Sequence, residues 1–131
     1  MPKKGKLLVV DDNLNILSAV KMLMENCFEK VITLSSPKSL VTTIQSESPD
    51  VLLLDMNFHA GINNGNEGIY WLNEVNSKFP KIKVVLFTAY ADIDLAVRAM
   101  KDGAFDFIVK PWNNEKLIET LLNAYNEGKT K

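Results

Sequence analysis

Short runs of apolar residues alternate along the chain with longer amphipathic segments. The short runs are rich in β-branched and aromatic residues and show little polar alternation, which is typical of strands buried on both faces of a parallel sheet. We expect five such strands, at residues 6–10, 31–34, 51–54, 82–87 and 105–109.

The segments between the expected strands carry apolar residues three or four positions apart, which is the spacing of an amphipathic helix. This spacing predicts helices over residues 14–27, 39–45, 67–79, 93–101 and 115–125. Pro37, Pro49 and Pro80 mark junctions between elements. The polar residues 126–131 predict a frayed end.

Five strands, each followed by a helix, indicate an α/β fold. Right-handed crossover connections favour a doubly wound open sheet, here five-stranded and parallel. The length of 131 residues fits a single domain. No repeat or linker divides the sequence, so we expect one domain over residues 1–131. This plan does not by itself define a function.

Composition narrows the class of protein. The net charge of −1 gives no electrostatic basis for binding nucleic acid or a membrane surface. No apolar run reaches the roughly 18 residues needed to span a bilayer. Cys27 is the one cysteine and cannot form an internal disulfide, which agrees with a reducing cytoplasm. We expect a cytoplasmic domain in which Cys27 packs on a helix face.

Polar residues with distinctive chemistry follow four of the expected strands. The first strand leads into Asp11 and Asp12, the third into Asp55, the fourth into Thr88 and the fifth into Lys110. Ligands bind at the carboxyl ends of strands in open α/β sheets. Converging carboxylates require a cation, and Mg²⁺ prefers such oxygen ligands. A hydroxyl and an ammonium can hold phosphoryl oxygens, and a central carboxylate can act as the nucleophile.

At these positions the chain resembles the receiver domain of bacterial two-component response regulators. The matching pieces are Leu-Leu-Val-Val-Asp-Asp-Asn at 7–13, Val-Leu-Leu-Leu-Asp-Met-Asn at 51–57, Phe-Thr-Ala-Tyr at 87–90 and Phe-Ile-Val-Lys-Pro at 107–111. The likeness covers nearly the whole chain. It implies a flavodoxin-like sheet with strand order 2-1-3-4-5.

The resemblance also implies roles for the acidic residues. Asp55 would be the phosphoacceptor. Asp12 would bind Mg²⁺ directly and Asp11 mostly through water, and the backbone carbonyl of Asn57 would complete the metal site. A domain of this kind is not an enzyme in the usual sense, because it catalyses only its own phosphorylation and dephosphorylation.

The remaining implied roles concern the fourth and fifth strands. Thr88 and Lys110 would hold phosphoryl oxygens, and the bond from Lys110 to Pro111 often carries a cis peptide in this family. Thr88 and Phe107 would form the conformational switch, although Phe107 is equally well interpreted as a core residue. Trp112 lies just beyond the site and is placed to report on it.

Residues 88–112 are most similar to receivers of the NtrC type, which precede an ATPase domain that activates transcription. The implied partners are a sensor histidine kinase and an output domain in a longer chain. A homodimer through the face of the fourth helix, fifth strand and fifth helix is a further expectation. Apolar residues at 93, 97 and 100 lie on that face at helical spacing.

The segment after Asp55 departs from the family pattern. It is several residues longer than usual, and His59 replaces the usual proline. Glycine and asparagine at 61 and 63–66 tolerate left-handed turns, so we expect an exposed, mobile loop beside the site. His59 is then a solvated loop residue or, alternatively, a gate to Asp55.

Three other functions compete with a phosphorylated receiver. A flavodoxin-like electron carrier needs a phosphate-binding loop rich in serine, threonine and glycine, where this chain has Asp-Asp-Asn. A degenerate receiver would act only as a constitutive binding module. A phosphatase would need a second aspartate two residues after Asp55, where the sequence has Asn57. At the first site, Asp12 or Asn13 could also simply cap the following helix.

Overall fold

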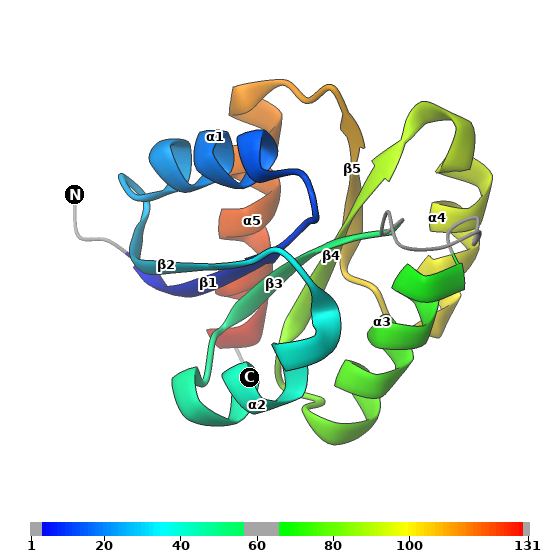
Figure 1. The fold of residues 1–131 in the computed structure, drawn as a ribbon, viewed down its shortest axis with the longest axis horizontal. Helices are drawn as coiled ribbons and strands as arrows, with labels where there is room; N and C mark the ends of the chain where they lie inside the picture. Colours follow the sequence, from blue (N-terminus) through cyan, green and yellow to red (C-terminus); the bar gives the residue numbers. More distant parts are fainter. Residues whose placement is uncertain (1–3, 57–65, 130–131) are drawn as a thin grey trace.

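The computed structural model describes residues 4–56 and 66–129. Five parallel strands form one sheet in the order β2-β1-β3-β4-β5, as predicted (Figure 1). The strands are β1 (Lys4–Val10), β2 (Phe28–Leu34), β3 (Val51–Asp55), β4 (Lys83–Ala89) and β5 (Asp106–Lys110). The helices are α1 (Leu14–Met24), α2 (Leu40–Glu47), α3 (Asn66–Lys78), α4 (Ile93–Ala99) and α5 (Asn114–Lys129). Three short 3₁₀-helices are η1 (Pro37–Ser39), η2 (Tyr90–Asp92) and η3 (Met100–Asp102).

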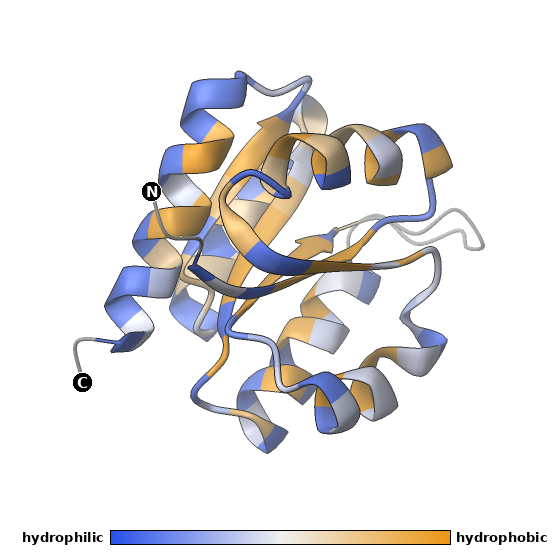
Figure 2. Cartoon of the chain, turned by 90° about the vertical axis from the view of Figure 1, so that its left-hand side faces the viewer, coloured by the Kyte–Doolittle hydropathy of each residue, from blue (hydrophilic) through white to orange (hydrophobic). Residues whose placement is uncertain are grey.

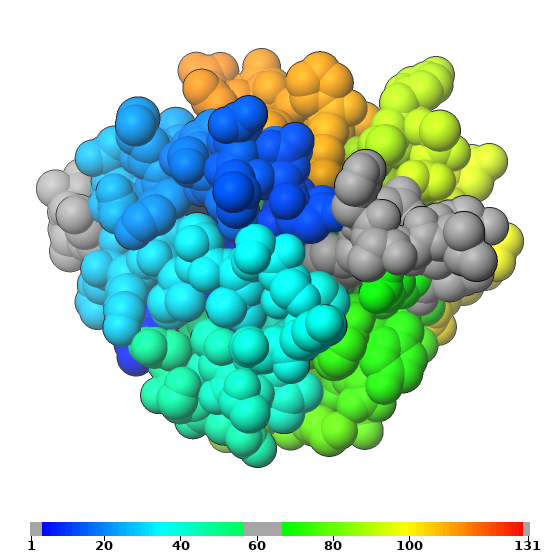
Figure 3. Space-filling model, viewed as in Figure 1, coloured from blue at the N-terminus to red at the C-terminus, as the bar shows by residue number. Residues whose placement is uncertain are grey.

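Helices cover both faces of the sheet. On one face α1 and α5 pack over a cluster that includes Leu53 and Phe87, and on the other α2, α3 and α4 pack over a cluster that includes Leu54 and Leu86. Alternating residues of each central strand therefore point into different layers, which explains the continuous apolar runs in the sequence. Figure 2 shows the mostly apolar strands between helices that carry both polar and apolar residues along their length. In the view of Figure 1 with all atoms drawn, residues of α1, of the segment from β2 to α2 and of α3 form much of the near surface (Figure 3).

The first predicted helix was too long and the second predicted strand too short. Helix α1 ends at Met24, and β2 already begins at Phe28. At its start β2 has two successive exposed residues, Glu29 and Lys30, between buried Phe28 and buried Val31. Exposure of consecutive residues agrees with the position of β2 at the edge of the sheet. Cys27 lies in the turn before β2 and not on a helix, although it is half-buried against the α1/α5 cluster.

Two helices also end differently from the prediction. Helix α4 gives way to η3 after Ala99, and the segment ends at Gly103 with a left-handed φ of 108°. Helix α5 continues to Lys129 where a frayed end was predicted. The extra turn is held by Lys129, whose ammonium lies 3.1 Å from Asp50 Oδ1 and over the ring of Tyr125.

Helix α3 begins in close contact with the end of β3. The backbone N–H of Gly68 donates a hydrogen bond of 3.1 Å to the carbonyl of Met56, the residue after Asp55. A Cβ atom on Gly68 would lie 2.5 Å from Met56 Cα, so only glycine fits at this approach. None of the helices in the described part of the chain is long and apolar enough to cross a membrane.

Candidate functional site

The predicted site residues gather at the carboxyl edge of the sheet. Asp55 is the last residue of β3 and pairs in register with Phe87 of β4, while Lys110 is the last residue of β5. Asp11 directly follows β1, and its N–H still donates to the carbonyl of Leu34 at 3.1 Å. Residues two positions before Asp55 and Lys110, Leu53 and Ile108, belong to the α1/α5 cluster. The side chains of Asp55 and Lys110 therefore point to the same face of the sheet as this cluster, and they lie at its end.

The ammonium of Lys110 bridges two carboxylates. Its Nζ lies 2.8 Å from Asp11 Oδ2 and donates a hydrogen bond of 3.0 Å to Asp55 Oδ1. Asp12 completes the cluster, since one carboxylate oxygen from each of Asp11, Asp12 and Asp55 lies within 4.8 Å of the others. The structure thus brings together four of the side chains singled out in the sequence.

Burial makes this cluster of charges costly without a counterion. Asp11 is fully buried and Asp55 is 3% exposed. Asp11 Oδ1 accepts a hydrogen bond from the N–H of Asn13. Asp11 Oδ2 is buried, and its close polar neighbour is the Lys110 ammonium at 2.8 Å, an ion-pair contact that does not meet the geometry of a regular hydrogen bond. A buried carboxylate oxygen in this state, beside two further carboxylates, fits a hard divalent cation such as Mg²⁺.

The charge state of Lys110 follows from its neighbours. Burial by itself would lower the pKa of Lys110, but hydrogen bonding and attraction from Asp11 and Asp55 outweigh that effect. The pKa of Lys110 is therefore raised above its ordinary value. The site holds a permanent cation at neutral pH, next to the carboxylate predicted to be the nucleophile.

Thr88 and Phe107 face the other layer. Leu86, two residues before Thr88, and Phe107, which pairs with Leu86, both pack in the α2/α3/α4 cluster. Thr88 is 1% exposed, and its hydroxyl donates to the carbonyl of Ala89 at 3.2 Å. Phe107 is half-buried. Phe107 thus packs with the cluster to which α4 contributes Ala96 and Ala99, and Thr88 follows Leu86 of the same cluster by two residues.

Local structure supports other details of the site. The peptide bond between Lys110 and Pro111 is cis, as the resemblance implied. Asn13 caps α1, since its side chain accepts hydrogen bonds from the N–H groups of Asn15 and Ile16. The capping alternative therefore holds for Asn13, while Asp11 and Asp12 belong to the cluster. Asn57, His59 and the predicted loop lie outside the described residues.

One group near the site was not expected from the sequence. The ring of Phe87 lies beneath the Lys110 ammonium, with Nζ 4.9 Å from the ring centroid. Trp112 packs against the same ring at a centroid distance of 5.3 Å. The contact follows from the register of β4 and β5, in which Phe87 pairs with Ile108, two residues before Lys110, and this register is not readable from the sequence.

Known proteins share both the sequence pattern and the fold. A family profile described as "Response regulator receiver domain" matches residues 7–122. The DNA-binding transcriptional regulator NtrC of Salmonella typhimurium is 28% identical over 128 residues, which cover 95% of this chain and 26% of that protein. The transcriptional regulatory protein ZraR of Klebsiella oxytoca is 30% identical over 118 residues, which cover 90% of this chain and 26% of that protein.

Solved structures agree with these relatives. The N-terminal signal receiver domain of a two-component system response regulator from Bacteroides fragilis is 57% identical and superposes with a TM-score of 0.86, over 94% of this chain and 98% of that one. The chain spans about a quarter of the length of the curated relatives, as the 26% coverage shows. The family profile covers most of the chain and the sheet has the fold of these relatives, so the chain belongs to the response regulator receiver domains.

Proposed function

We propose that the domain accepts a phosphoryl group on Asp55 from the phosphohistidine of a sensor histidine kinase. The observation that carries the proposal is the bridge from Lys110 to Asp11 and Asp55 at the carboxyl edge of the sheet. It supports the proposal because a buried carboxylate, an acidic cluster and a cation next to each other are what phosphoryl transfer to a carboxylate needs.

The transfer is a displacement at phosphorus. A lone pair on a carboxylate oxygen of Asp55 forms the new P–O bond while the P–N bond to the donor imidazole breaks. The imidazole leaves with the bonding electron pair and takes up a proton. Lys110 keeps its proton and provides positive charge to an oxygen of the phosphoryl group, and the Thr88 hydroxyl provides a hydrogen bond after a small rotation.

The acidic cluster is proposed to hold Mg²⁺. Asp12 and Asp55 would supply oxygen ligands and Asp11 would act mostly through water, and the backbone carbonyl of Asn57 is a further ligand by resemblance. The bound ion would neutralise charge on the phosphoryl oxygens during transfer. The buried Asp11 oxygen without a regular hydrogen bond is the feature of this chain that supports the assignment.

Intact-mass measurement tests the proposal. The domain is incubated with Mg²⁺ and a small acyl phosphate, which replaces the kinase as donor. We expect the mass to rise by one phosphoryl group in the wild type and to stay unchanged in Asp55→Asn or in EDTA. Labelling that survives either change would refute the assignment, and an unlabelled wild type would favour a constitutive binding module.

The output is proposed to act through the face of α4, β5 and α5. Val97 and Met100 on this face are 50% and 37% exposed, and Tyr90 just before α4 is 80% exposed. When Thr88 moves towards the phosphoryl group, Phe107 gains room to turn inward and α4 can shift. Phosphorylation then changes the populations of two packings of the same segment. We propose a second copy of the domain as the partner of this face.

Amide chemical shifts with and without beryllofluoride, a phosphoryl mimic, test the output. We expect changes between residues 88 and 112 together with a concentration-dependent increase in molecular mass. Shift changes confined to the surroundings of Asp55 would contradict the switch. We further propose, from the similarity to transcriptional regulators, that residues 1–131 form one domain of a longer regulator of transcription and that this regulator works in the cytoplasm.

A further inference from the structure

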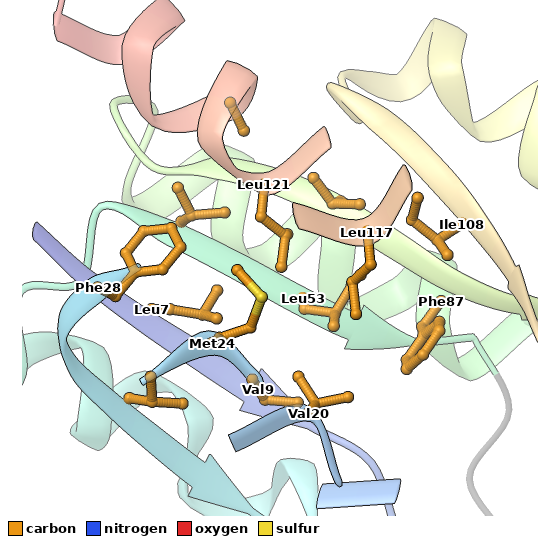
Figure 4. Packing of buried hydrophobic residues seen from close by; sticks show 14 of the residues in the cluster. Leu7, Val9, Val20, Met24, Phe28, Leu53, Phe87, Ile108, Leu117 and Leu121 are labelled. Atoms are coloured by element: carbon orange, nitrogen blue, oxygen red, sulfur yellow. The ribbon is translucent and has the colours of Figure 1, made fainter. Parts of the chain in front are cut away.

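Phe87 occupies a position from which it contacts the reacting groups of the site. It pairs in register with Asp55, and its carbonyl accepts a hydrogen bond of 3.0 Å from the N–H of Met56. Its side chain is fully buried and points into the same layer as Leu53. In Figure 4 Phe87 lies at the end of the cluster opposite Phe28.

The ring of Phe87 forms the third contact of the Lys110 ammonium. Two contacts are ionic, to Asp11 Oδ2 at 2.8 Å and to Asp55 Oδ1 at 3.0 Å. The third is the ring face, whose centroid lies 4.9 Å from Nζ. The negative face of an aromatic ring attracts a cation within about 6 Å. The ring can therefore add its attraction to that of the two carboxylates and help to hold the ammonium in place.

We propose that Phe87 is a positioning residue, whose ring face places the Lys110 ammonium beside Asp55 for contact with the incoming phosphoryl group. This inference rests on the proposed function and names a residue that acts through Lys110. An aliphatic residue of similar size would fill the core but would leave the ammonium against an apolar surface without a compensating attraction. The chemistry of the ring, and not only its volume, is what the site uses.

Trp112 gives this contact an optical signal. Its ring packs on Phe87 at 5.3 Å with an interplanar angle of 54°, and its indole N–H donates to Asn114 Oδ1 at 2.8 Å. The hydrogen bond fixes the indole to the first residue of α5. A displacement of the ammonium or of the Phe87 ring therefore changes the surroundings of the indole. Because the chain has two tryptophans, a Trp71→Phe background isolates the emission of Trp112.

A double-mutant cycle in urea tests the contact without any phosphorylation. The variants are Phe87→Leu, Lys110→Met and the double variant. The cavity that leucine leaves costs the same unfolding free energy with and without Lys110, so it cancels when the effect of Phe87→Leu is compared in the two backgrounds. We expect the two changes to be coupled by about threefold to tenfold in the unfolding constant. Phe28→Leu is the matched control, because Phe28 is equally buried in the same cluster but far from the site. Its cycle with Lys110→Met should give no coupling.

Graded fluorination tests the positioning role. Residue 87 is replaced by mono-, di- and trifluorinated phenylalanine, which weaken the ring's negative face stepwise with little change of volume. We expect the rate of phosphorylation by an acyl phosphate to fall with each fluorine, about threefold to tenfold over the series. The Trp112 emission change on phosphorylation should decrease in parallel, and the same series at Phe28 should leave both quantities constant.

Two results would overturn the inference: coupling no greater than in the Phe28 cycle, or a rate that stays flat along the fluorinated series. Failure of the proposed function is distinct from either, because it would leave the wild-type domain unlabelled. The urea cycle alone would then decide whether the ring holds the ammonium.

Discussion

The contact between Gly68 and the end of β3 leads to a quantitative prediction for Gly68→Ala. The added Cβ would lie 2.5 Å from Met56 Cα and 2.7 Å from the Met56 carbonyl oxygen. Ordinary carbon contacts need about 3.5 Å, so the first turn of α3 or the end of β3 must move by about 1 Å. Both partners are backbone, and no flexible side chain can yield.

Overpacking of this kind costs about 1–3 kcal/mol, and the better helix propensity of alanine returns up to about 1 kcal/mol. We expect a net loss of about 1–2 kcal/mol. An unfolding entropy of about 0.28 kcal/mol/K, from about 2.1 cal/mol/K for each of the 131 residues, converts this to a fall of about 4–7 °C in Tm.

Gly128→Ala provides the matched control. Gly128 also lies in a helix, but a Cβ there would meet only side-chain atoms of Lys83, at 3.8 and 4.0 Å. We expect this variant to gain about 0.5 kcal/mol in unfolding free energy. Urea titration followed by circular dichroism measures both variants. If Gly68→Ala equals or exceeds the wild type in stability, the tight approach of α3 to β3 is wrong.

Three further predictions concern the site and its supports. Asn13→Ala should lower the unfolding free energy by about 1 kcal/mol, measured by urea titration, because α1 loses its N-cap. Asp12→Ala should weaken both Mg²⁺ binding and phosphorylation, whereas Thr88→Ala should slow only phosphorylation. Calorimetry measures Mg²⁺ binding and intact mass measures phosphorylation. Equal loss of Mg²⁺ binding in both variants would contradict the assigned roles. Because the pKa of Lys110 is raised on folding, its stabilisation is present below the unfolded-state pKa of about 10.4 and is lost as pH rises through the folded-state pKa. The metal-free wild type should therefore lose more unfolding free energy than Lys110→Met on going from about pH 9 to about pH 11.5, and equal losses would count against the ion pair.

The parts of the fold that follow from local burial were predictable from the sequence. Strand β3 is buried on both faces, so its residues form one apolar run that ends at Asp55. The site was predictable for a related reason, because parallel strands bring their carboxyl ends to one edge. Asp11, Asp12, Asp55 and Lys110 could be assembled from their positions at strand ends alone.

The errors occurred where tertiary contacts decide the structure. Glu29 and Lys30 are polar and were left out of the predicted strand, but pairing of β2 with β1 makes them part of an edge strand. The polar end of α5 looks frayed, but Asp50 and Tyr125 hold Lys129 in place. The contact of the Phe87 ring with Lys110 depends on the register between β4 and β5, which the order of motifs along the chain does not contain.

The sheet divides the interior into two layers that, among the described residues, have no buried side chain in common. Substitutions in opposite layers that lie more than about 10 Å apart should therefore have additive effects on the free energy of unfolding. In evolutionary terms, one layer can change the sizes of its side chains without compensating changes in the other. Strand β3 contributes Leu53 to one layer and Leu54 to the other. Because β3 packs in both layers, sequence changes in either layer can affect the position of Asp55 at its end. The outer surfaces of the helices on the two faces can change independently of each other.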